Sequence, residues 1–334
     1  MTDREAVFLE KLARTGLWQL PGLLQALPDE TARLARLCYA ASPAGDWLDT
    51  PPEVFFSCAA HARYLRENVS WTRALPEPLF LAYVLHPRVN NEALCDCRPV
   101  FYAALAERLR GLPEEAAILE INRWCAEHVA YQPTDERTRS ALAVLRAGFG
   151  RCGEESMFAV NVLRACGFAA RQVYVPRWAH CDDNHAWVEV RCGGAWHFLG
   201  ACEPEAVLDR GWFNSAAGRA VLVHSRCFGE PEPDAEVIGR EGDVAYCNET
   251  ARYADVRRLT VRVTDENGMS AAGADVDFCI LNNCEWYPAA TVQTDASGMA
   301  ALTCGLGSLR LLARRDGLCC EAFVSPEGTG PVVL

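Results

Sequence analysis

The sequence contains no long apolar run. Its first residues, "MTDREAVFLEKLARTG", lack the apolar centre of a signal peptide, and no stretch approaches the length of a membrane span. These absences favour a cytoplasmic protein, although a secreted or surface-anchored protein without its leader would share them. Basic residues are also few: 32 lysines and arginines against 44 acidic residues give a net charge of −12. That balance argues against nucleic acids and anionic membranes as partners.

The sequence also lacks the motifs that most strongly indicate a metal or a nucleotide. It has no paired Cys-x-x-Cys spacing of a zinc site and no glycine-rich loop with the lysine of a phosphate site. Two clusters, "CDC" at residues 95–97 with the nearby His86 and "HCDDNH" at residues 180–185, hold zinc-binding residue types without that spacing. We therefore predict no metal and no cofactor.

Cysteines, in contrast, are abundant. The 17 cysteines are an odd number spread over the whole chain, often within apolar runs such as "ARLCYA" and "VDFCIL". Disulfide frameworks are typical of small secreted domains, so most of these cysteines are predicted to be buried thiols in a reducing compartment.

The first part of the chain is predicted to be helical. Apolar residues recur at helical spacing in residues 29–41, 53–68, 97–112 and 114–131, and loops rich in proline and glycine separate these segments. We expect a helical N-terminal region over residues 1–114.

After Gly148 the pattern becomes mixed. The helical run "MFAVNVLRACGF" is followed by the strand-like runs "ARQVYVP", "HAWVEVRC" and "AWHFLGA", and Gly193 and Gly194 join the last two as a hairpin. The pattern predicts an α+β domain over residues 115–228, in which one helix packs on an antiparallel sheet.

The remainder of the chain is predicted to be a linker and a small β domain. Residues 229–256, which begin "GEPEPDAEVIGREGD", are typical of a linker. Residues 257–334 alternate apolar and polar residues between turn signals such as "DENG" and "DASG", which predicts a β-sandwich.

The stretch "GRCGEES" at residues 150–156 places Cys152 where a loop becomes a helix. A helix N-terminus favours a thiolate, and glycines on either side permit a tight entry and a close approach of substrate. One more buried cysteine among 17 is the plain alternative. The position nevertheless suits a nucleophile, whose own backbone N–H can face a developing oxyanion.

A nucleophilic cysteine needs a base and a group that orients that base. His185, in "CDDNHAWVEV", stands at the start of a predicted strand and is one of only seven histidines. Asp182 and Asp183 precede it, and Glu203 lies on the far end of the returning strand. Cross-strand geometry favours Glu203 over the two aspartates, which suit a solvated turn.

Four blocks together carry a resemblance: "GRCGEES", "GFAARQVY", "NHAWVEV" and "GGAWHFLGACEPE" occur in order. They resemble the transglutaminase-like superfamily, in the branch that includes peptide N-glycanases and microbial transglutaminase-domain proteins. The resemblance implies a papain-like helix-on-sheet core in which Cys152 is the nucleophile and His185 is the base. It also implies an aspartate at the position that Gly200 occupies here, so Glu203 is retained as the orienting residue.

Two tryptophans resemble family features more loosely. Trp124 could lie on the oxyanion side of the pocket, where its indole N–H would donate, although packing on a helix is its plainer role. Trp178, in "VPRWAHCDDNH", could form a wall of the cleft. The C-terminal sandwich resembles Ig-like or carboxypeptidase-regulatory-like accessory domains and could contact another protein.

These observations lead to a cysteine-nucleophile enzyme that hydrolyses or transfers an amide of a peptide, protein or glycopeptide. One alternative is an impaired relative that binds peptide or glycan in the same cleft. A second is a scaffold protein whose sandwich carries the interaction. Because a binding module has no chemical need for a thiol at a helix start, the enzyme is favoured, and hydrolysis is favoured over transfer.

Overall fold

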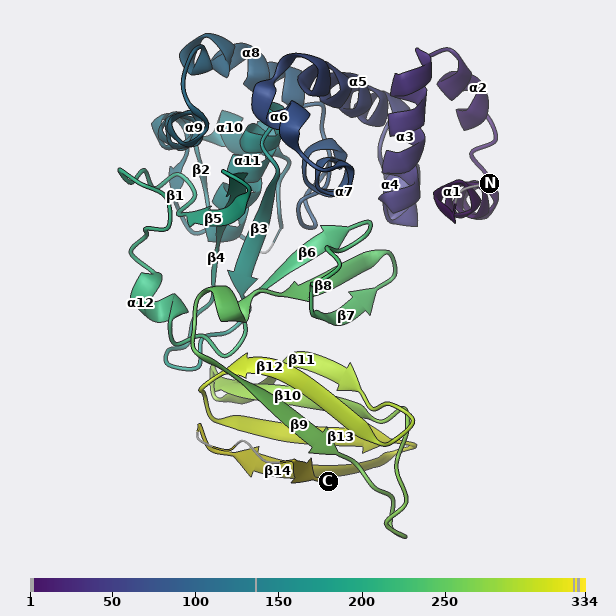
Figure 1. Ribbon diagram of the computed structural model, residues 1–334, viewed down its shortest axis with the longest axis vertical. Helices are drawn as coiled ribbons and strands as arrows, with labels where there is room; N and C mark the ends of the chain where they lie inside the picture. Colours follow the sequence, from purple (N-terminus) through teal and green to yellow (C-terminus); the bar gives the residue numbers. More distant parts are fainter. Residues whose placement is uncertain (1–2, 136, 327, 329–330) are drawn as a thin grey trace.

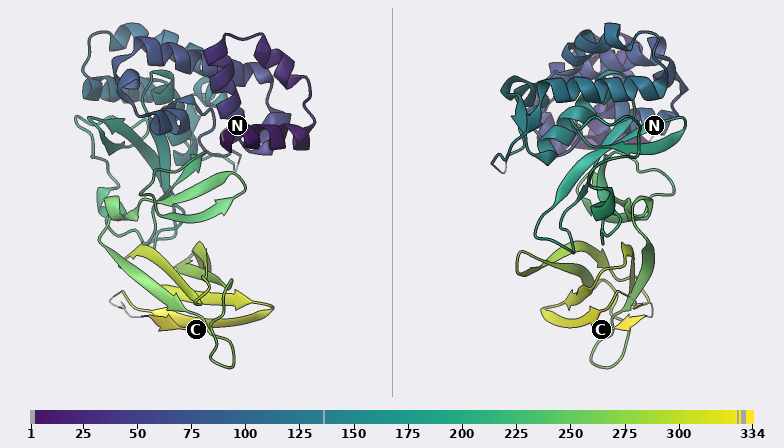
Figure 2. Two further views of the ribbon diagram at one scale, coloured as in Figure 1. Left: turned by 45° about the vertical axis from the view of Figure 1, so that its right-hand side comes forward. Right: turned by 90° about the vertical axis from the view of Figure 1, so that its left-hand side faces the viewer.

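The computed structural model describes residues 3–135, 137–326, 328 and 331–334. Helices form one end of the elongated molecule, an antiparallel sheet lies in the middle and a β-sandwich forms the other end (Figures 1 and 2). This arrangement confirms the predicted α+β class with a helical N-terminus and C-terminal antiparallel strands.

The N-terminal part is helical, as predicted. Its elements are α1 (Asp3–Thr15), α2 (Leu20–Gln25), α3 (Asp29–Ala41), α4 (Ala44–Asp49), α5 (Pro52–Asn68), α6 (Ser70–Ala74), α7 (Glu77–Phe80), a π-helical turn η1 (Leu81–Leu85), α8 (Arg98–Leu109) and α9 (Glu114–His128). The four segments with helical spacing correspond to α3, α5, α8 and α9. No helix among the described residues is both long and apolar enough to cross a membrane.

The central part contains the predicted helix on an antiparallel sheet. Its elements are β1 (Ala130–Tyr131), α10 (Ala141–Ala147), β2 (Phe149–Gly150), α11 (Cys152–Ala165), β3 (Ala170–Val175), β4 (His185–Cys192), β5 (Ala195–Leu199), α12 (Asn214–Ala217), β6 (His224–Phe228), β7 (Val237–Glu241), β8 (Val244–Asn248) and a short 3₁₀ helix η2 (Thr250–Arg252). Six strands pair in the order β5-β4-β3-β6-β8-β7.

Helix α11 lies at the centre of this part. It packs against β3 and β4 on one side and against α8, α9 and α10 on the other (Figure 1). Its side chains from Glu154 to Ala165 are all buried, so the helix is enclosed on every side and its apolar residues are not confined to one face. The first turn of α11 lies beside the end of the sheet at which β3 ends and β4 begins.

The strands that follow α11 match the predicted hairpin. β4 and β5 pair from Val188 opposite Leu199 to Cys192 opposite Ala195. Gly193 and Gly194 form the turn with positive φ angles of 56° and 84°, which glycine adopts without strain.

The predicted linker proved wrong for residues 237–248. β7 and β8 in this segment extend the central sheet beyond β6. Ile238, Ala245 and Cys247 are buried, and Gly242 turns the hairpin with φ of 56°. These strands were not recognised from the sequence because each has only five residues, their turn is charged, and glutamates and prolines precede them.

The C-terminal part is the predicted sandwich of two sheets. Its strands are β9 (Val256–Arg262), β10 (Asp275–Asn282), β11 (Glu285–Gln293), β12 (Met299–Gly305), β13 (Leu309–Arg315), β14 (Leu318–Val324) and β15 (Val332–Val333). One sheet has the order β11-β10-β13-β14 and the other β12-β9-β15. A shared apolar core, which includes Leu259, Phe278 and Leu311, lies between them.

The sandwich is packed directly on the central part. Gly305 N–H donates to Val221 O at 2.9 Å, and Val221 belongs to the same apolar core as the sandwich. A Cβ on Gly305 would lie 1.9 Å from Ala220 O, so glycine is required at this contact. The two parts therefore meet through close backbone contacts.

All 17 cysteines lie in the described part of the chain and are free thiols. As predicted, most of them are buried, namely Cys38, Cys58, Cys97, Cys125, Cys166, Cys227, Cys247, Cys279 and Cys304. Cys152 is only partly buried, which separates it from this set.

Candidate active site

The chain enters α11 through a short constrained segment. α10 ends at Gly148, whose φ is 74°, and β2 then pairs with β1 in parallel. A Cβ on Gly150 would lie 2.9 Å from the Cβ of Glu154, whereas Gly153 has open space beside it. The two glycines around Arg151 and Cys152 thus serve different needs: Gly150 allows a tight entry and Gly153 leaves the face beside Cys152 clear.

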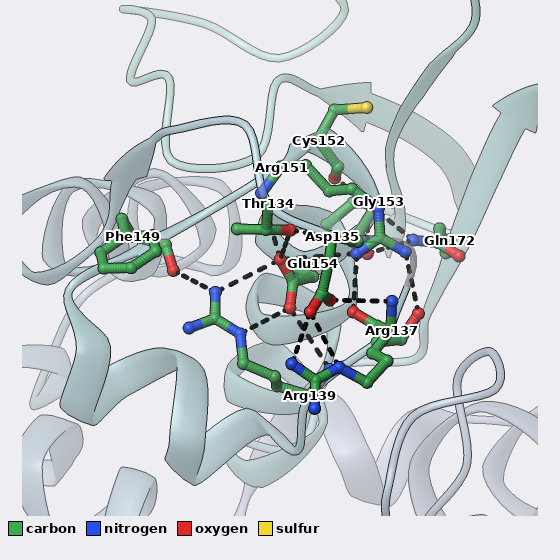
Figure 3. A network of polar contacts seen from close by, with 12 residues as sticks. Thr134, Asp135, Arg137, Arg139, Phe149, Arg151, Cys152, Gly153, Glu154 and Gln172 are labelled. Atoms are coloured by element: carbon green, nitrogen blue, oxygen red, sulfur yellow. Dashed lines mark hydrogen bonds and ion pairs between the residues drawn. The ribbon is translucent and has the colours of Figure 1, made fainter.

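A buried carboxylate fixes the first turn of α11. Glu154 is fully buried, and its carboxylate accepts hydrogen bonds from Arg139 Nε at 2.8 Å and from Thr134 Oγ1 at 2.7 Å. Burial favours the neutral acid, but these donors outweigh it and lower the pKa of Glu154 to about 2. In Figure 3 the Cys152 sulfur points away from this network. The network therefore positions the turn and leaves the thiol available.

Cys152 and His185 line the same cleft, which has a volume of about 510 Å³. The backbone N–H of Ala186, the residue after His185, lies close enough to the Cys152 sulfur to lower the pKa of the thiol. α11 therefore brings its first residue to the start of β4, as the sequence predicted. Mainly polar side chains complete the walls, among them Gln172, Arg177 and Tyr287.

The sequence led us to expect that the helix N-terminus lowers the pKa of Cys152, but burial has the larger effect. Burial raises its pKa above the ordinary value, and the N–H groups of Ala186 and Gly153 compensate only in part. The nearby Glu155 carboxyl also raises this pKa. The helix N-terminus is thus outweighed, and Cys152 is a neutral thiol at neutral pH.

His185 is buried among aromatic rings. Its ring centroid lies 4.8 Å from that of Trp212, 5.0 Å from Phe213 and 5.8 Å from Trp187. This burial lowers the pKa of His185 to about 4, against a smaller opposing effect of Asp183. The imidazole is therefore neutral at pH 7 and can accept a proton, and its buried Nε2 has no hydrogen-bond partner among the described residues.

We expect the pH profile of Cys152 alkylation to reflect this neutral pair. The rate should rise about tenfold per pH unit from about pH 5 to pH 8, because only the thiolate reacts and its fraction grows with pH. Iodoacetamide labelling followed by mass spectrometry would measure it, with the exposed Cys319 of β14 as internal reference. A rate plateau below about pH 7 would instead indicate a thiolate–imidazolium pair and contradict the prediction.

The comparison with known families agrees with this geometry. Residues 103–201, from α8 to the residue after Gly200, match the sequence profile of the transglutaminase-like superfamily. The chain carries a transglutaminase-like domain. The matched range begins within α8, somewhat before the predicted boundary at residue 115, and it includes both Cys152 and His185.

Comparisons with curated proteins and with solved structures add little to this assignment. No curated protein matches the chain. A crystal structure of a candidate cysteine protease from Cytophaga hutchinsonii is similar at 15% sequence identity over 55% of this chain and 68% of that chain, with a TM-score of 0.32. The superfamily assignment rests on the match to residues 103–201.

The transglutaminase-like domain departs from the family pattern at Gly200, and Glu203 occupies the space beside it. A Cβ on Gly200 would lie only 2.3 Å from Glu203 Oε2. Glu203 Oε1 accepts a hydrogen bond from Trp212 Nε1 at 3.0 Å, whereas its Oε2 is buried without a partner among the described residues. The role of Glu203 as the orienting residue stays a prediction, and its carboxylate lies where a side chain at residue 200 would begin.

The two aspartates before His185 accept hydrogen bonds from backbone N–H groups. Asp182 Oδ1 accepts from Asn283 N at 2.7 Å, and Asp183 Oδ1 accepts from Asn184 N at 2.7 Å. Neither lines the cleft. This placement agrees with the turn role that the sequence favoured for both.

Trp124 and Trp178 are both in apolar clusters of the transglutaminase-like part. Trp124 is 5% exposed and packs against Phe101, Phe158 and His128. Trp178 is 4% exposed and lies in the same apolar cluster as Trp187 of β4. Neither is among the residues that line the cleft around Cys152, so their predicted part in substrate binding stays a prediction.

Several residues at the site were not singled out from the sequence. Gln172 donates to Gly153 O at 2.9 Å and to Ser156 Oγ at 2.7 Å, and thereby fastens β3 to the first turn of α11. Trp212 contacts both His185 and Glu203 from a loop without any motif. Tyr287 comes from the sandwich, more than 100 residues after His185. Only Gln172 lay within a block of the resemblance.

Glu155, one turn after Cys152, is a second buried carboxyl at the site. It is 4% exposed, and burial followed by the charge of Glu203 raises its pKa to about 8. The folded protein therefore keeps a proton that the unfolded chain releases once pH exceeds about 4.5. Its contribution to stability is present at low pH and is lost as pH rises toward 8.

We expect Glu155→Gln to stabilise the protein at about pH 8 by roughly 2 kcal/mol, with little change at about pH 5, because glutamine needs no proton to stay neutral. Thermal unfolding of wild type and variant at both pH values would measure the difference in Tm. Glu266→Gln, at an exposed loop position, is the matched control and should change Tm little at either pH. Equal shifts for Glu155→Gln at both pH values would contradict the raised pKa.

Proposed function

We propose that this protein is a cysteine-dependent amide hydrolase or acyl transferase that acts on peptides or proteins. One observation carries the proposal. A single polar cleft contains Cys152 at a helix start and His185 at a strand start, together with Ala186, whose backbone lies beside the sulfur. The match of residues 103–201 to the transglutaminase-like superfamily supports the same chemistry.

In the proposed reaction, Cys152 Sγ attacks the carbonyl carbon of the amide while His185 accepts the thiol proton. The C–N bond breaks as the imidazolium returns this proton to the leaving nitrogen, and a thioester forms on Cys152. Water then attacks the thioester, which releases the acid and restores the thiol. A primary amine in place of water would give a new amide.

The neutral resting pair supports general-base activation. Because His185 is a free base at neutral pH, it can accept the thiol proton at the moment of attack. The backbone N–H groups of Glu154 and Glu155 donate to Arg151 O, whereas those of Cys152 and Gly153 precede the first hydrogen bond of α11 and suit a developing negative charge on oxygen. We favour hydrolysis over transfer, because polar walls admit water to the thioester.

A second candidate function is binding without turnover. Gly200 stands where the family has an aspartate, and the buried His185 Nε2 has no hydrogen-bond partner among the described residues. These observations favour an impaired relative that holds a peptide or a glycopeptide in the cleft.

Product analysis separates these functions. Wild-type protein is incubated with glutamine-containing peptides and with N-glycosylated peptides, each with and without a primary amine. Mass spectrometry then distinguishes peptide cleavage, side-chain deamidation, release of glycan and amine incorporation. Any of these products, formed by wild type and absent with Cys152→Ala, supports the enzyme. Saturable peptide binding without any product supports the second candidate.

A further inference from the structure

The cleft around Cys152 has a wall from the C-terminal sandwich. Tyr287, on β11, lines the cleft together with Cys152 and His185. The guanidinium of Arg177, from the loop between β3 and β4, lies 4.7 Å from the centroid of the Tyr287 ring. Figure 1 shows this end of the sandwich directly below the central sheet. The active-site cleft is therefore built from two parts of the chain.

The sandwich also fastens the loop that carries Arg177. Asn282, 1% exposed at the end of β10, donates through Nδ2 to Trp178 O at 2.9 Å and to Cys181 O at 2.7 Å. The next residue, Asn283, donates its backbone N–H to Asp182. Because Asn282 and Tyr287 belong to one hairpin, this hairpin positions the loop beside Arg177 and supplies the ring that Arg177 stacks on.

Arg177 carries the uncompensated charge of this cleft. Besides His185, the charged residues that line it are Asp135, Arg151 and Arg177. Asp135 is paired with Arg137, and Arg151 lies 3.4 Å from the carboxylate of Glu154.

For Arg177, the described residues supply no carboxylate. Within the described ranges, the guanidinium of Arg177 makes one hydrogen bond, to the adjacent Pro176 O at 3.3 Å, and its buried Nε has no partner. A positive charge is thus left open in the cleft of a protein whose net charge is −12.

The chemistry of this pair selects its ligand. A guanidinium that stacks on an aromatic face keeps its N–H edge free, and that edge matches the two oxygens of a carboxylate. Tyr287 holds the plane of the guanidinium, and the loop fastened by Asn282 holds its position. An acidic group on a substrate in the cleft would therefore meet a guanidinium whose orientation and position are already set. It would displace no existing ion pair of Arg177.

We propose that Arg177 and Tyr287 form a specificity-determining pair that binds a carboxylate of the substrate, so that the protein prefers acidic peptides. The inference rests on the proposed function, in which Cys152 attacks a peptide amide in the same cleft. The carboxylate comes either from an acidic side chain near the reacting amide or from the C-terminus of the peptide. Arg177 and Tyr287 bind and select substrate and take no part in the bond-making steps.

Matched peptides test the preference. One series differs only by glutamate or glutamine beside the target amide, with the C-terminus amidated. A second series has neutral side chains and differs only by a free or an amidated C-terminus. We expect kcat/KM to be about tenfold or more higher for the acidic member of one series, mainly through KM. The series that responds identifies the source of the carboxylate.

Variants assign the preference to the pair. Arg177→Gln should remove the preference for acidic peptides, and Arg177→Lys should keep part of it. Tyr287→Ala should weaken the preference, whereas Tyr287→Phe should retain it, because the ring and not the hydroxyl contacts the guanidinium. Arg315→Gln, at an exposed arginine of β13 that pairs with Asp316, is the control and should leave it unchanged. Tm is measured for each variant, so that loss of folding is recognised separately.

Binding separates this inference from the proposed function. Cys152→Ala retains the cleft, and its affinity for acidic and neutral peptides can be measured without turnover. Preferred binding of acidic peptides that disappears with Arg177→Gln supports the pair even where no product forms. Equal affinity and equal kcat/KM for acidic and neutral members of both series would overturn it, while Cys152-dependent turnover would leave the proposed function standing.

Discussion

Replacing Cys152 with alanine is expected to reduce amide turnover by about 10⁴-fold or more, to the level of the uncatalysed reaction plus whatever the cleft supplies by binding. Without the sulfur no thioester can form, and His185 has no thiol proton to accept. The partly buried Cys152 contributes little packing, so the stability of the variant should stay within about 1 kcal/mol of wild type. Product formation and Tm are measured on the same preparation.

A cysteine at the other end of the same helix provides the control. Cys166, directly after α11, is 1% exposed within the apolar core. Cys166→Ala should lower the free energy of unfolding by about 1 to 2 kcal/mol, because it leaves a cavity, and Tm should fall with it. Its kcat should remain close to that of wild type. Opposite responses of the two variants would assign chemistry to Cys152 and packing to Cys166. Full turnover by Cys152→Ala, in contrast, would exclude it as the nucleophile.

The predicted elements that proved correct are those with local signals. The hairpin around Gly193 and Gly194 follows from two glycines between alternating strands, and the four helices follow from apolar spacing. The segment 237–248 failed because its strands are only five residues each and its turn is charged. Its pairing with β6 is a long-range contact, which alternation over so few residues cannot specify.

The features of the site also differ in whether local sequence signals predict them. The sequence placed Cys152 and His185 in one site because each begins a regular element within a recognisable block. The direction of the pKa shift of Cys152 could not be predicted, since the effect of a helix N-terminus can be inferred from position, whereas burial depends on the packed structure. Arg177 and Tyr287 could not be paired from sequence, because their contact depends on how the sandwich docks on the loop before His185.

The orienting residue gives the second large expected effect. Glu203→Gln should reduce turnover by about 10² to 10⁴-fold, because a glutamine cannot stabilise the imidazolium that forms on His185. Two buried atoms motivate this prediction, because neither His185 Nε2 nor Glu203 Oε2 has a partner in the described part of the chain. Trp212 contacts both side chains: its ring lies against the histidine and its Nε1 donates to the glutamate. The prediction requires a hydrogen bond between these two atoms during the reaction.

Asp183→Asn is the matched control for charge. It also removes a carboxylate whose field acts on His185, yet that carboxylate accepts a bond from the backbone of Asn184 and does not line the cleft. Turnover should therefore change by about threefold at most, because the variant loses only the distant charge of the Asp183 carboxylate. Comparable losses in both variants would show that a general negative field, rather than Glu203 itself, supports the imidazole.

Gly200 allows a test by restoration. Gly200→Asp alone should be destabilised and inactive, because the new Cβ would lie 2.3 Å from Glu203 Oε2. In the double variant Gly200→Asp/Glu203→Ala that oxygen is gone, and the closest remaining atom is the Cβ of residue 203 at 3.0 Å, which a shift of a few tenths of an ångström relieves. An aspartate then starts from the family position. If Glu203 acts in place of that aspartate, the double variant should turn over at least about tenfold faster than Glu203→Ala alone. If Glu203→Gln is silent and the double variant gains nothing, no carboxylate at this end of β5 orients His185, and the imidazole works without a third member.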